Sequence, residues 1–168
     1  EKGAEGVMDN IARLCSSLLD SAAMKKSDIS GAGMGVPGMI NGKDGVVVVS
    51  NNLGWFNLDI VDGLKRRTGF VFSITNDANS AALGEATAGA AKGTRNMLMV
   101  TLGTGVGGGI IINGQLYTGC NGIAGEIGHM VIRKDGEPCN CGRRGCLEAY
   151  CSAASLVRFA ERALEDGR

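Results

Sequence analysis

The 168 residues suit one domain of ordinary size or parts of two. The 17 lysines and arginines balance the 17 aspartates and glutamates, and this zero net charge argues against a role on nucleic acid or on a bilayer surface. No apolar run approaches the length of a membrane span, and no signal-peptide pattern is present. The sequence begins at Glu1 without a methionine and stops within a helical pattern at Arg168, so we expect an internal segment of a longer protein.

The first half of the chain alternates between helix and strand patterns. Strands are predicted at 31–36, 46–49 and 70–75, and helices over 5–23, from Asn57 or Asp59 to Arg67, and over 78–91. Such alternation indicates an α/β fold, and in α/β folds ligands bind at the carboxyl ends of strands.

Two polar stretches follow predicted strands. Asn76-Asp77-Ala78-Asn79 lies at the end of the third strand, so Asp77 is well placed for chemistry. An aspartate in the first turn of a helix is also an effective cap. The stretch 51–55, Asn-Asn-Leu-Gly-Trp, holds the only tryptophan; its amides can face a ligand, or the tryptophan can cover the core. The residues alone leave both pairs of alternatives open.

A glycine-rich stretch follows Met97–Leu102, an apolar run that predicts a buried strand. Five glycines between 103 and 109 surround Thr104. Backbone N–H groups in such a loop can approach a phosphate closely, whereas a plain hairpin is the alternative explanation. The pattern Gly-x-Gly-x-x-Gly also matches the dinucleotide fingerprint, but that fingerprint must open a helix. Here Ile110–Ile112 and Asn113-Gly114 predict a strand and a hairpin, so we favour a phosphate loop over an oxidoreductase.

A cysteine cluster comes next. Cys139-x-Cys141-x4-Cys146 has the spacing of metal ligands, and His129, the only histidine, precedes it by ten residues. Three thiolates and one imidazole fill a closed tetrahedral zinc site. A disulfide or inert thiols are the alternatives, and we favour the metal because Cys139 and Cys141 are poorly spaced to bond each other.

Three cysteines stand outside this cluster. Cys151 is the main competing ligand, whereas Cys15 and Cys120 are expected to be buried thiols. From Leu147 onward, apolar spacing predicts an amphipathic helix that faces a core extending beyond this segment.

In combination, these motifs resemble the signatures of the ROK family of sugar kinases and repressors. The likeness runs from about Gly33 to Cys151 and rests on Gly35-Val36-Pro37-Gly38, Asn76–Asn79, Leu102–His129 with its Gly125-Glu126-x-Gly128-His129 turn, and Cys139–Glu148. It implies an actin-like ATPase (ribonuclease-H-like) α/β fold with two domains around a cleft, both incomplete here. Residues 1–75 would be the remainder of the small N-terminal domain. Residues 76–168 would be the first part of the large C-terminal domain with its zinc-binding loop.

The resemblance also implies a chemistry. Asp77 would be the catalytic base, which accepts the proton of the sugar 6-hydroxyl as that oxygen attacks the γ-phosphorus of ATP. The sugar would be held by Gly38, Asn52, Asn76, Asp77, Glu126, His129 and Glu148. The ATP phosphates would meet Gly103, Thr104 and Gly105, and Zn²⁺ would bind His129, Cys139, Cys141 and Cys146. The zinc would fix the loop so that both carboxylates face the sugar.

The family resemblance leaves the substrate partly open. Asn52-Leu53-Gly54-Trp55 is most similar to the bacterial glucokinases of the family, so glucose is the expected hexose, with ATP and Mg²⁺ as the donor. Kinases for N-acetylglucosamine, N-acetylmannosamine, allose and fructose share most of these motifs, and polyphosphate as donor is not readable. The expected protein is a cytoplasmic homodimer of carbohydrate metabolism, a kinase of glycolysis, with no nucleic-acid or membrane partner for this segment.

Two other functions compete with the kinase. A sugar-responsive transcriptional repressor of the same family would carry a helix-turn-helix upstream of Glu1, and a zinc-stabilised binding module would lack catalysis. The family's acidic, glycine-rich N-terminal phosphate loop and the C-terminal part that closes on adenosine have no counterpart in this sequence. We therefore expect the segment alone to have little or no kinase activity.

Overall fold

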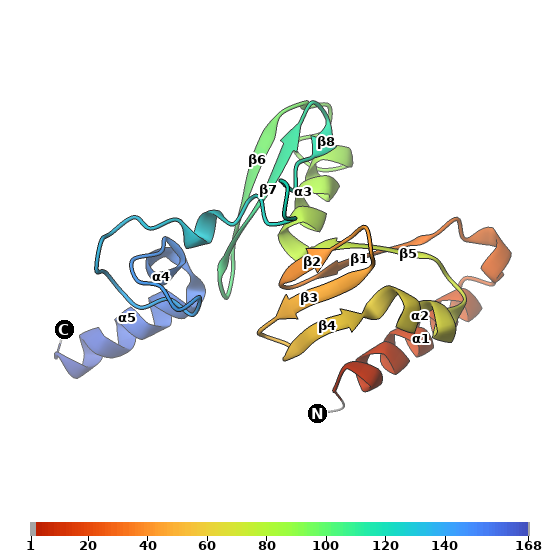
Figure 1. Ribbon diagram of the computed structural model, residues 1–168, viewed down its shortest axis with the longest axis horizontal. Coiled ribbons are helices and arrows are strands. Elements are labelled where there is room, and N and C mark those ends of the chain that lie inside the picture. Colours follow the sequence, from red (N-terminus) through yellow and green to blue (C-terminus); the bar gives the residue numbers. More distant parts are fainter. Residues whose placement is uncertain (1–2, 168) are drawn as a thin grey trace. The chain divides into compact units, whose positions relative to one another are not determined.

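The computed structural model describes residues 3–167, which form two compact units, Glu1–Ser80 (unit 1) and Ala81–Arg168 (unit 2) (Figure 1). Both units contain helices and strands, as the α/β prediction requires. None of the helices in the described part of the chain combines the length and apolar character that a membrane span needs.

Unit 1 pairs strands in two sheets. Its elements are α1 (Gly3–Ser21), η1 (Lys26–Asp28), β1 (Ala32–Val36), β2 (Met39–Asn41), β3 (Val46–Ser50), β4 (Trp55–Asp59), α2 (Ile60–Thr68) and β5 (Phe72–Asn76). β1 and β5 are parallel, with Val36 opposite Asn76, so the carboxyl ends of both strands lie together. β2, β3 and β4 form an antiparallel sheet. α3 (Asp77–Thr87) begins directly after β5.

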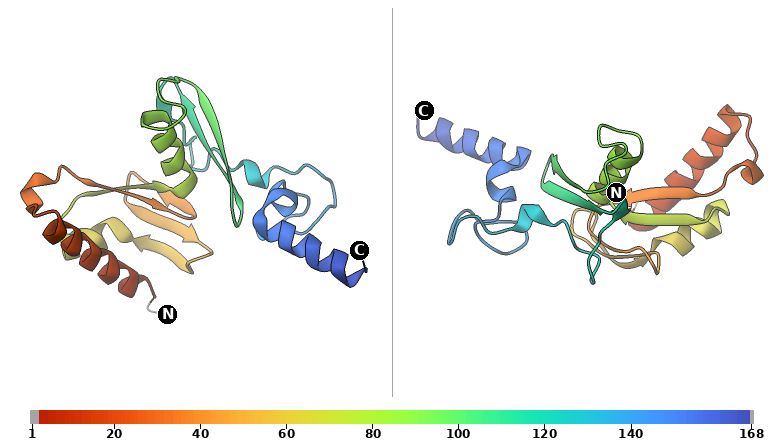
Figure 2. Two further views of the ribbon diagram at one scale, coloured as in Figure 1. Left: turned by 180° about the vertical axis from the view of Figure 1, so that it is seen from behind. Right: turned by 90° about the horizontal axis from the view of Figure 1, so that it is seen from above.

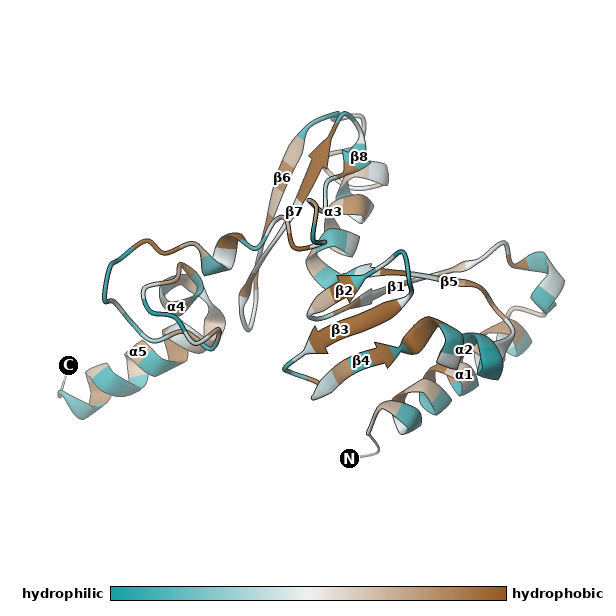
Figure 3. Ribbon diagram, in the orientation of Figure 1, coloured by the Kyte–Doolittle hydropathy of each residue, from teal (hydrophilic) through white to brown (hydrophobic). Residues whose placement is uncertain are grey.

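The core of unit 1 is apolar, and its residues come from α1, α2 and the strands of both sheets. Met8 of α1, Val47 of β3 and Leu64 of α2 are fully buried. Figure 3 shows the apolar character of β3 and of the start of α2. Gly63 lets α2 approach α1, because a Cβ there would lie 2.5 Å from the sulfur of Met8. The other buried members of the core are Val36, Ile40, Trp55, Ile60, Phe72 and Ile74.

Side-chain chemistry sets both ends of α2. Of the two expected caps, Asp59 is the one used, because its Oδ1 accepts a hydrogen bond from the N–H of Asp62 at 3.0 Å. Asn57 lies within β4 instead. Gly69 closes the helix in the left-handed conformation, with φ of 72°, and its N–H donates to the carbonyl of Lys65.

Unit 2 combines a small sheet with a long irregular segment. Its elements after α3 are β6 (Met97–Leu102), β7 (Val106–Ile112), β8 (Gln115–Leu116), η2 (Ile127–His129), α4 (Glu148–Cys151) and α5 (Ala153–Glu165). β7 pairs antiparallel with both β6 and β8, and Figure 2 shows the β6–β7 pair from two further sides. Asn113 and Gly114 both have positive φ, as the two-residue turn between β7 and β8 requires.

The expected glycine loop is shorter than the sequence suggested. Gly107, Gly108 and Gly109 belong to β7 rather than to a loop. Glycine is needed in this strand because a Cβ on Gly108 would collide with the carbonyl oxygen of Gly125. Residues 97–102 form the expected strand, β6, but the expectation that it is buried is wrong. Burial alternates along β6, and Leu98, Val100 and Leu102 are exposed. β6 is an edge strand next to β7, and its alternate residues 98, 100 and 102 lie on an exposed face.

The two helices of unit 2 also differ from expectation. α3 ends at Thr87, four residues before the expected end at Ala91. The expected helix from Leu147 is divided in two, because Ser152 is extended, with φ of −81° and ψ of 161°. Its hydroxyl then caps α5 by accepting the N–H of Ser155.

Residues 117–147 contain little regular structure beyond η2. Single bridges join Val131 to Cys146 and Pro138 to Arg144. The hydroxyl of Tyr150 accepts the N–H of Glu137 at 2.8 Å and so ties the segment to α4. Backbone hydrogen bonds and tight turns, rather than a packed core, therefore shape this part of the chain.

Candidate active site

Four ligand atoms converge in unit 2. One atom each from His129, Cys139, Cys141 and Cys146 lies within 4.8 Å of all the others. Nδ1 of His129 is 3.6 Å from Sγ of Cys139, and the Sγ atoms of Cys141 and Cys146 are also 3.6 Å apart. A tetrahedral zinc ion with bonds of about 2.3 Å to sulfur holds its thiolates about 3.8 Å apart. The donor set and its spacing therefore fit Zn²⁺.

Tight turns bring these ligands together. Gly142 and Gly145 have φ of 85° and 78°, which glycine adopts without strain. The N–H of Cys139 donates to the carbonyl of Arg143 at 2.9 Å, and the N–H of Gly142 donates back to Cys139. Cys146 is fully buried, and so the cluster has a fixed inner ligand.

The thiols of the cluster carry charge unequally. Partial burial raises the pKa of Cys139 to about 12, with further increases from the thiols of Cys141 and Cys146. Burial also acts to raise the pKa of Cys141, but hydrogen bonds from the backbone and guanidinium of Arg143, and from the other two thiols, outweigh it and lower that pKa to about 6. A thiolate therefore forms most readily at Cys141, which suits the binding of a cation.

Arg143 is a site residue that sequence reasoning missed. Its guanidinium donates to the carbonyl of His129 at 3.0 Å, and its hydrogen bond to Cys141 raises its own pKa. It therefore joins one ligand segment to another. A basic residue placed between metal-binding cysteines was the available signal, since thiolate charge must be offset.

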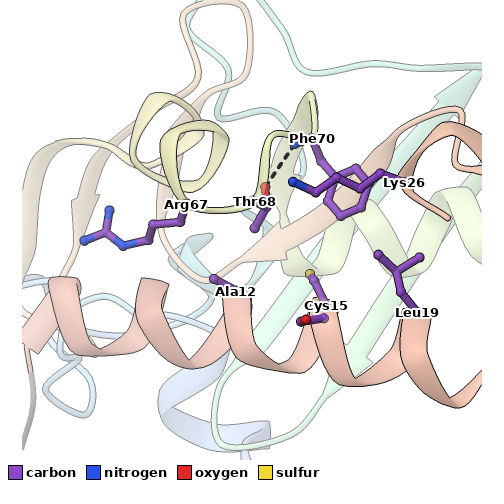
Figure 4. A pocket seen from close by; sticks show the side chains of 8 residues that line it. Ala12, Cys15, Leu19, Lys26, Arg67, Thr68 and Phe70 are labelled. Atoms are coloured by element: carbon purple, nitrogen blue, oxygen red, sulfur yellow. Dashed lines mark hydrogen bonds between the residues drawn. The ribbon is translucent and has the colours of Figure 1, made fainter.

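The cysteines outside the cluster differ in their surroundings. Cys151 is exposed and does not join the four converging ligands. Cys120 is exposed as well, so the expectation of a buried thiol is wrong; it lies in a turn between Gly119 and Gly122, both with positive φ. Cys15 is half-buried at a small pocket between α1 and the segment after α2. Figure 4 shows this pocket, and no predicted site residue lines it.

Glu126 and His129 lie at the two ends of η2. Gly128, between them, is buried, and glycine is needed there because a Cβ would collide with the carbonyl oxygen of Val106. Nε2 of His129 lies 3.9 Å from Oε2 of Glu126, while Nδ1 faces Cys139. One ring nitrogen is thus directed to the cluster and the other toward the exposed carboxylate, so the histidine can serve both a metal and a ligand hydroxyl.

The turn between β6 and β7 is the expected phosphate loop. The N–H of Gly103 is used inside the turn, since it donates to the carbonyl of Gly105 at 3.0 Å. Within residues 3–167, no hydrogen bond occupies the amides of Thr104 and Gly105. Glu148, at the start of α4, approaches this turn, and its Oε2 accepts the N–H of Val106 at 2.9 Å.

In unit 1, Gly38 follows β1 and lies beside Asn76, the last residue of β5. Nδ2 of Asn76 donates to the carbonyl of Gly38 at 3.1 Å, and Oδ1 of Asn76 accepts the N–H groups of Ala78 and Asn79. Asn76 therefore caps α3. Asp77 is exposed and bonds only the N–H of Ala78, at 3.0 Å, among the described residues. The capping role that competed with chemistry at Asp77 thus belongs largely to its neighbour.

The Asn51–Trp55 stretch combines a buried tryptophan with exposed amides. Trp55 is buried and covers the core. Asn52 lies exposed in a turn that Gly54 closes, with φ of 66°. The end of β3 holds a residue that sequence reasoning missed: the hydroxyl oxygen of Ser50 is buried without a hydrogen-bond partner in residues 3–167. Ser50 packs against Gly38, where a Cβ would lie 3.1 Å from its own.

The predicted site residues fall into two groups. Unit 1 brings together Gly38, Asn76 and Asp77 at one end of its parallel strands, with Asn52 in the turn after β3. Unit 2 brings together Glu148, the glycine turn and the four cluster residues, with Glu126 next to His129.

Comparison with known proteins identifies the family. Residues 1–167 match the ROK family. The chain belongs to the ROK family. A glucokinase of Halalkalibacterium halodurans is 45% identical over 161 residues, which cover 95% of this chain and 49% of the relative. A xylose repressor of Bacillus subtilis is 41% identical over 128 residues, which cover 76% of this chain and 33% of the relative.

A solved ROK structure confirms the expected fold. The crystal structure of a ROK family glucokinase from Streptomyces griseus in complex with glucose and AMPPNP matches 98% of this chain with a TM-score of 0.84 and 36% identity. The chain covers 52% of that protein, so the actin-like ATPase fold of ROK kinases is present here in part. The chain thus spans about half the length of the kinases it matches.

Proposed function

We propose that this chain is part of an ATP-dependent hexose kinase that phosphorylates the 6-hydroxyl of glucose. One observation carries the proposal: Asp77 is exposed at the carboxyl end of β5, while Asn76 takes over the capping of α3. A catalytic base must be held in place and still be able to accept a proton; the exposed carboxylate of Asp77 meets both conditions, because Oδ1 accepts the N–H of Ala78 and a carboxylate has further acceptor sites. The identity of 45% with a glucokinase supports the same conclusion.

In the proposed mechanism, Asp77 accepts the proton of the sugar 6-hydroxyl. The oxygen forms a bond to the γ-phosphorus of ATP, the bond from that phosphorus to the β–γ bridging oxygen breaks, and ADP leaves with the electron pair. Gly38, Asn52 and Asn76 of unit 1 and Glu126, His129 and Glu148 of unit 2 would bind the other sugar hydroxyls. A carboxylate accepts hydrogen bonds from two neighbouring hydroxyls, so it can discriminate between sugar stereoisomers.

The phosphates of ATP would meet the turn of Gly103, Thr104 and Gly105. The open amides of Thr104 and Gly105 support this assignment, because they can donate to an anion. ATP is expected to bind as its Mg²⁺ complex. Unit 1 and unit 2 would be parts of the small and large domains of the kinase. A cytoplasmic homodimer in glycolysis belongs to the same proposal.

The proposed role of Zn²⁺ is structural. His129, Cys139, Cys141 and Cys146 would hold it, and when bound it supplies a fixed tetrahedral centre rather than a reactive group. All four ligands belong to the segment between Glu126 and Glu148, so the positions of both proposed sugar-binding carboxylates would depend on the metal.

The test uses the full-length protein, ATP and a panel of hexoses, with Asp77→Asn beside the wild type. We expect glucose to be phosphorylated, and kcat to fall by about 10²- to 10⁴-fold in the variant, because a general base is lost. Asp62→Asn is the matched control, since Asp62 is an exposed residue paired with Arg66 on α2. Equal turnover by Asp77→Asn and wild type would contradict the role of Asp77, and a different preferred hexose would change the substrate alone.

A transcriptional repressor is the second candidate, favoured by the identity of 41% with the Bacillus subtilis xylose repressor. A folded, zinc-loaded full-length protein that phosphorylates no hexose, but binds DNA and releases it with a sugar, would establish this function instead. The exposed Asp77 favours the kinase, because a repressor has no need of a base.

A further inference from the structure

The carboxylate of Glu148 lies between the glycine turn and the zinc-binding cluster. Its Oε2 accepts the N–H of Val106, the first residue after the turn, at 2.9 Å. Its Oε1 lies 3.9 Å from Sγ of Cys139. One half-buried side chain therefore contacts both the expected phosphate loop and a proposed zinc ligand.

The contact leaves no spare room. A Cβ added to Gly105 would collide with Oε2 of Glu148, whereas a Cβ added to Gly103 would meet no atom within 4 Å. Neither glycine has a positive φ, so the absence of a side chain at Gly105 reflects the closeness of the carboxylate rather than backbone strain.

A second tie holds the other end of the turn. The N–H of Ala153, at the start of α5, donates to the carbonyl of Gly103 at 2.8 Å. The N–H of Leu147 donates to the carbonyl of Met130, next to His129, at 2.9 Å. The segment 147–153 therefore fastens both ends of the glycine turn and is itself fastened to the metal-binding loop.

We propose that Glu148 is a positioning residue for the phosphate loop, in addition to the sugar contact assigned above. This inference rests on the proposed kinase function. A hydrogen bond from a backbone N–H to an ionised carboxylate is stronger than a neutral one and fixes the direction of the amide. Phosphoryl transfer depends on placing the γ-phosphate correctly, so a small displacement of this turn weakens nucleotide binding and slows the reaction.

If the proposal holds, sugar affinity and nucleotide affinity depend on each other through the side chain of Glu148. If Glu148 only binds sugar, changes at Glu148 leave nucleotide affinity in sugar-free protein unaltered. If it also holds the turn, they weaken nucleotide binding without any sugar present. Conversely, a bulkier residue in the turn at Gly105 displaces Glu148 and weakens glucose binding.

The first experiment measures AMPPNP binding, with Mg²⁺ and without glucose, to full-length protein by calorimetry. We expect Glu148→Ala to weaken it by about fivefold or more, and Glu148→Gln, which keeps an acceptor oxygen for Val106, to lose less. Glu126→Gln is the matched control, since the carboxylate of Glu126 lies beside His129. It should keep wild-type AMPPNP affinity. Wild-type AMPPNP affinity in Glu148→Ala would overturn the proposal.

The second experiment measures glucose binding without nucleotide. Gly105→Ala should weaken it by about fivefold or more, whereas Gly103→Ala should change it by less than about twofold. If Gly105→Ala bound glucose as tightly as Gly103→Ala, the result would contradict a functional contact between the turn and Glu148.

A third readout separates failure of this inference from failure of the proposed function. Hydrogen exchange at the Val106 amide should accelerate in Glu148→Ala and remain unchanged in Glu126→Gln, whether or not the protein phosphorylates a sugar. If the wild-type protein lacks kinase activity but the variants show this pattern of exchange, the kinase function is refuted and the positioning role of Glu148 is supported. Unchanged exchange at the Val106 amide in Glu148→Ala would refute the positioning role of Glu148.

Discussion

Most of the buried apolar side chains of unit 1 lie within residues 32–76 and share one core, whereas residues 117–145 of unit 2 bury no apolar side chain. The buried positions in the second segment are Gly128 and Gly145, which have no side chains. Its apolar residues Met130, Val131 and Ile132 are more than half exposed. Three proposed sugar ligands, Glu126, His129 and Glu148, nevertheless belong to or border this weakly packed segment, so metal-ligand geometry has to replace burial there.

The comparison explains where the metal is needed. Apolar burial, which contributes roughly 25 cal/mol per Å², stabilises the core of unit 1. A segment without a core needs a metal or disulfides to become rigid, as small domains do. The four converging ligands supply such a point, and Arg143 adds a polar tie between two of them.

The largest expected effect comes from loss of the cluster. Cys146→Ser removes its buried ligand, and structural zinc binding is worth about 10–16 kcal/mol in zinc-finger peptides, so we expect residues 126–151 to lose order. Metal analysis and hydrogen exchange of the full-length protein check this, with Cys15→Ser as the control outside the cluster. Exchange in 126–151 should become fast, while β1 and β5 stay protected. Slow exchange in a zinc-free variant would show that packing holds the segment.

The reverse experiment targets the core of unit 1. Leu64→Ala empties a fully buried position and should cost about 2–5 kcal/mol of unfolding free energy. Leu14→Ala, at a position that is 63% exposed, should cost less than about 0.5 kcal/mol. Urea denaturation measures both, and metal analysis should find wild-type zinc content in each folded variant. A loss of zinc in Leu64→Ala would contradict the view that ligand geometry, rather than the core of unit 1, holds the metal-binding loop.

A smaller effect sharpens the view that turn geometry shapes the metal-binding loop. Gly142 and Gly145 both have positive φ, and alanine there costs about 1–2 kcal/mol. A Cβ on Gly145 would in addition collide with the carbonyl oxygen of Arg133, whereas one on Gly142 meets nothing within 4 Å. Gly145→Ala should therefore lower the thermal midpoint and zinc affinity more than Gly142→Ala. Equal losses would indicate that backbone strain, not the close contact, decides.

Periodicity and turn chemistry predicted much of the fold. The helix over 5–23, the strands at 31–36 and 46–49, the hairpin at Asn113-Gly114 and the mixed α/β class are all present. Short-range signals could not show that Gly107–Gly109 form a strand, because the reason for glycine at position 108 is the close approach of Gly125, which lies far along the sequence. Nor could they divide the last helix at Ser152, since a serine fits both a helix and a cap.

The candidate site was predictable in its residues more than in its contacts. Metal spacing pointed to the four ligands, which do converge. The contact of Glu148 with the glycine turn spans 42 residues of sequence and leaves no local pattern. The hydroxyl of Ser50, which is buried without a hydrogen-bond partner among residues 3–167, could not be predicted for the same reason, because burial of a polar atom depends on the folded chain around it.

The most direct test of the central claim is glucose binding to the full-length protein as purified, after removal of zinc by a chelator, and after return of Zn²⁺. Calorimetry gives the affinity, and metal analysis gives the zinc content of each sample. If the metal-binding loop holds the sugar-binding carboxylates, the purified protein contains one zinc ion per chain. Glucose binding is then lost when the zinc is removed and recovered when Zn²⁺ is returned. A stripped protein that binds glucose as tightly as the loaded one would contradict the claim that the metal positions the sugar site.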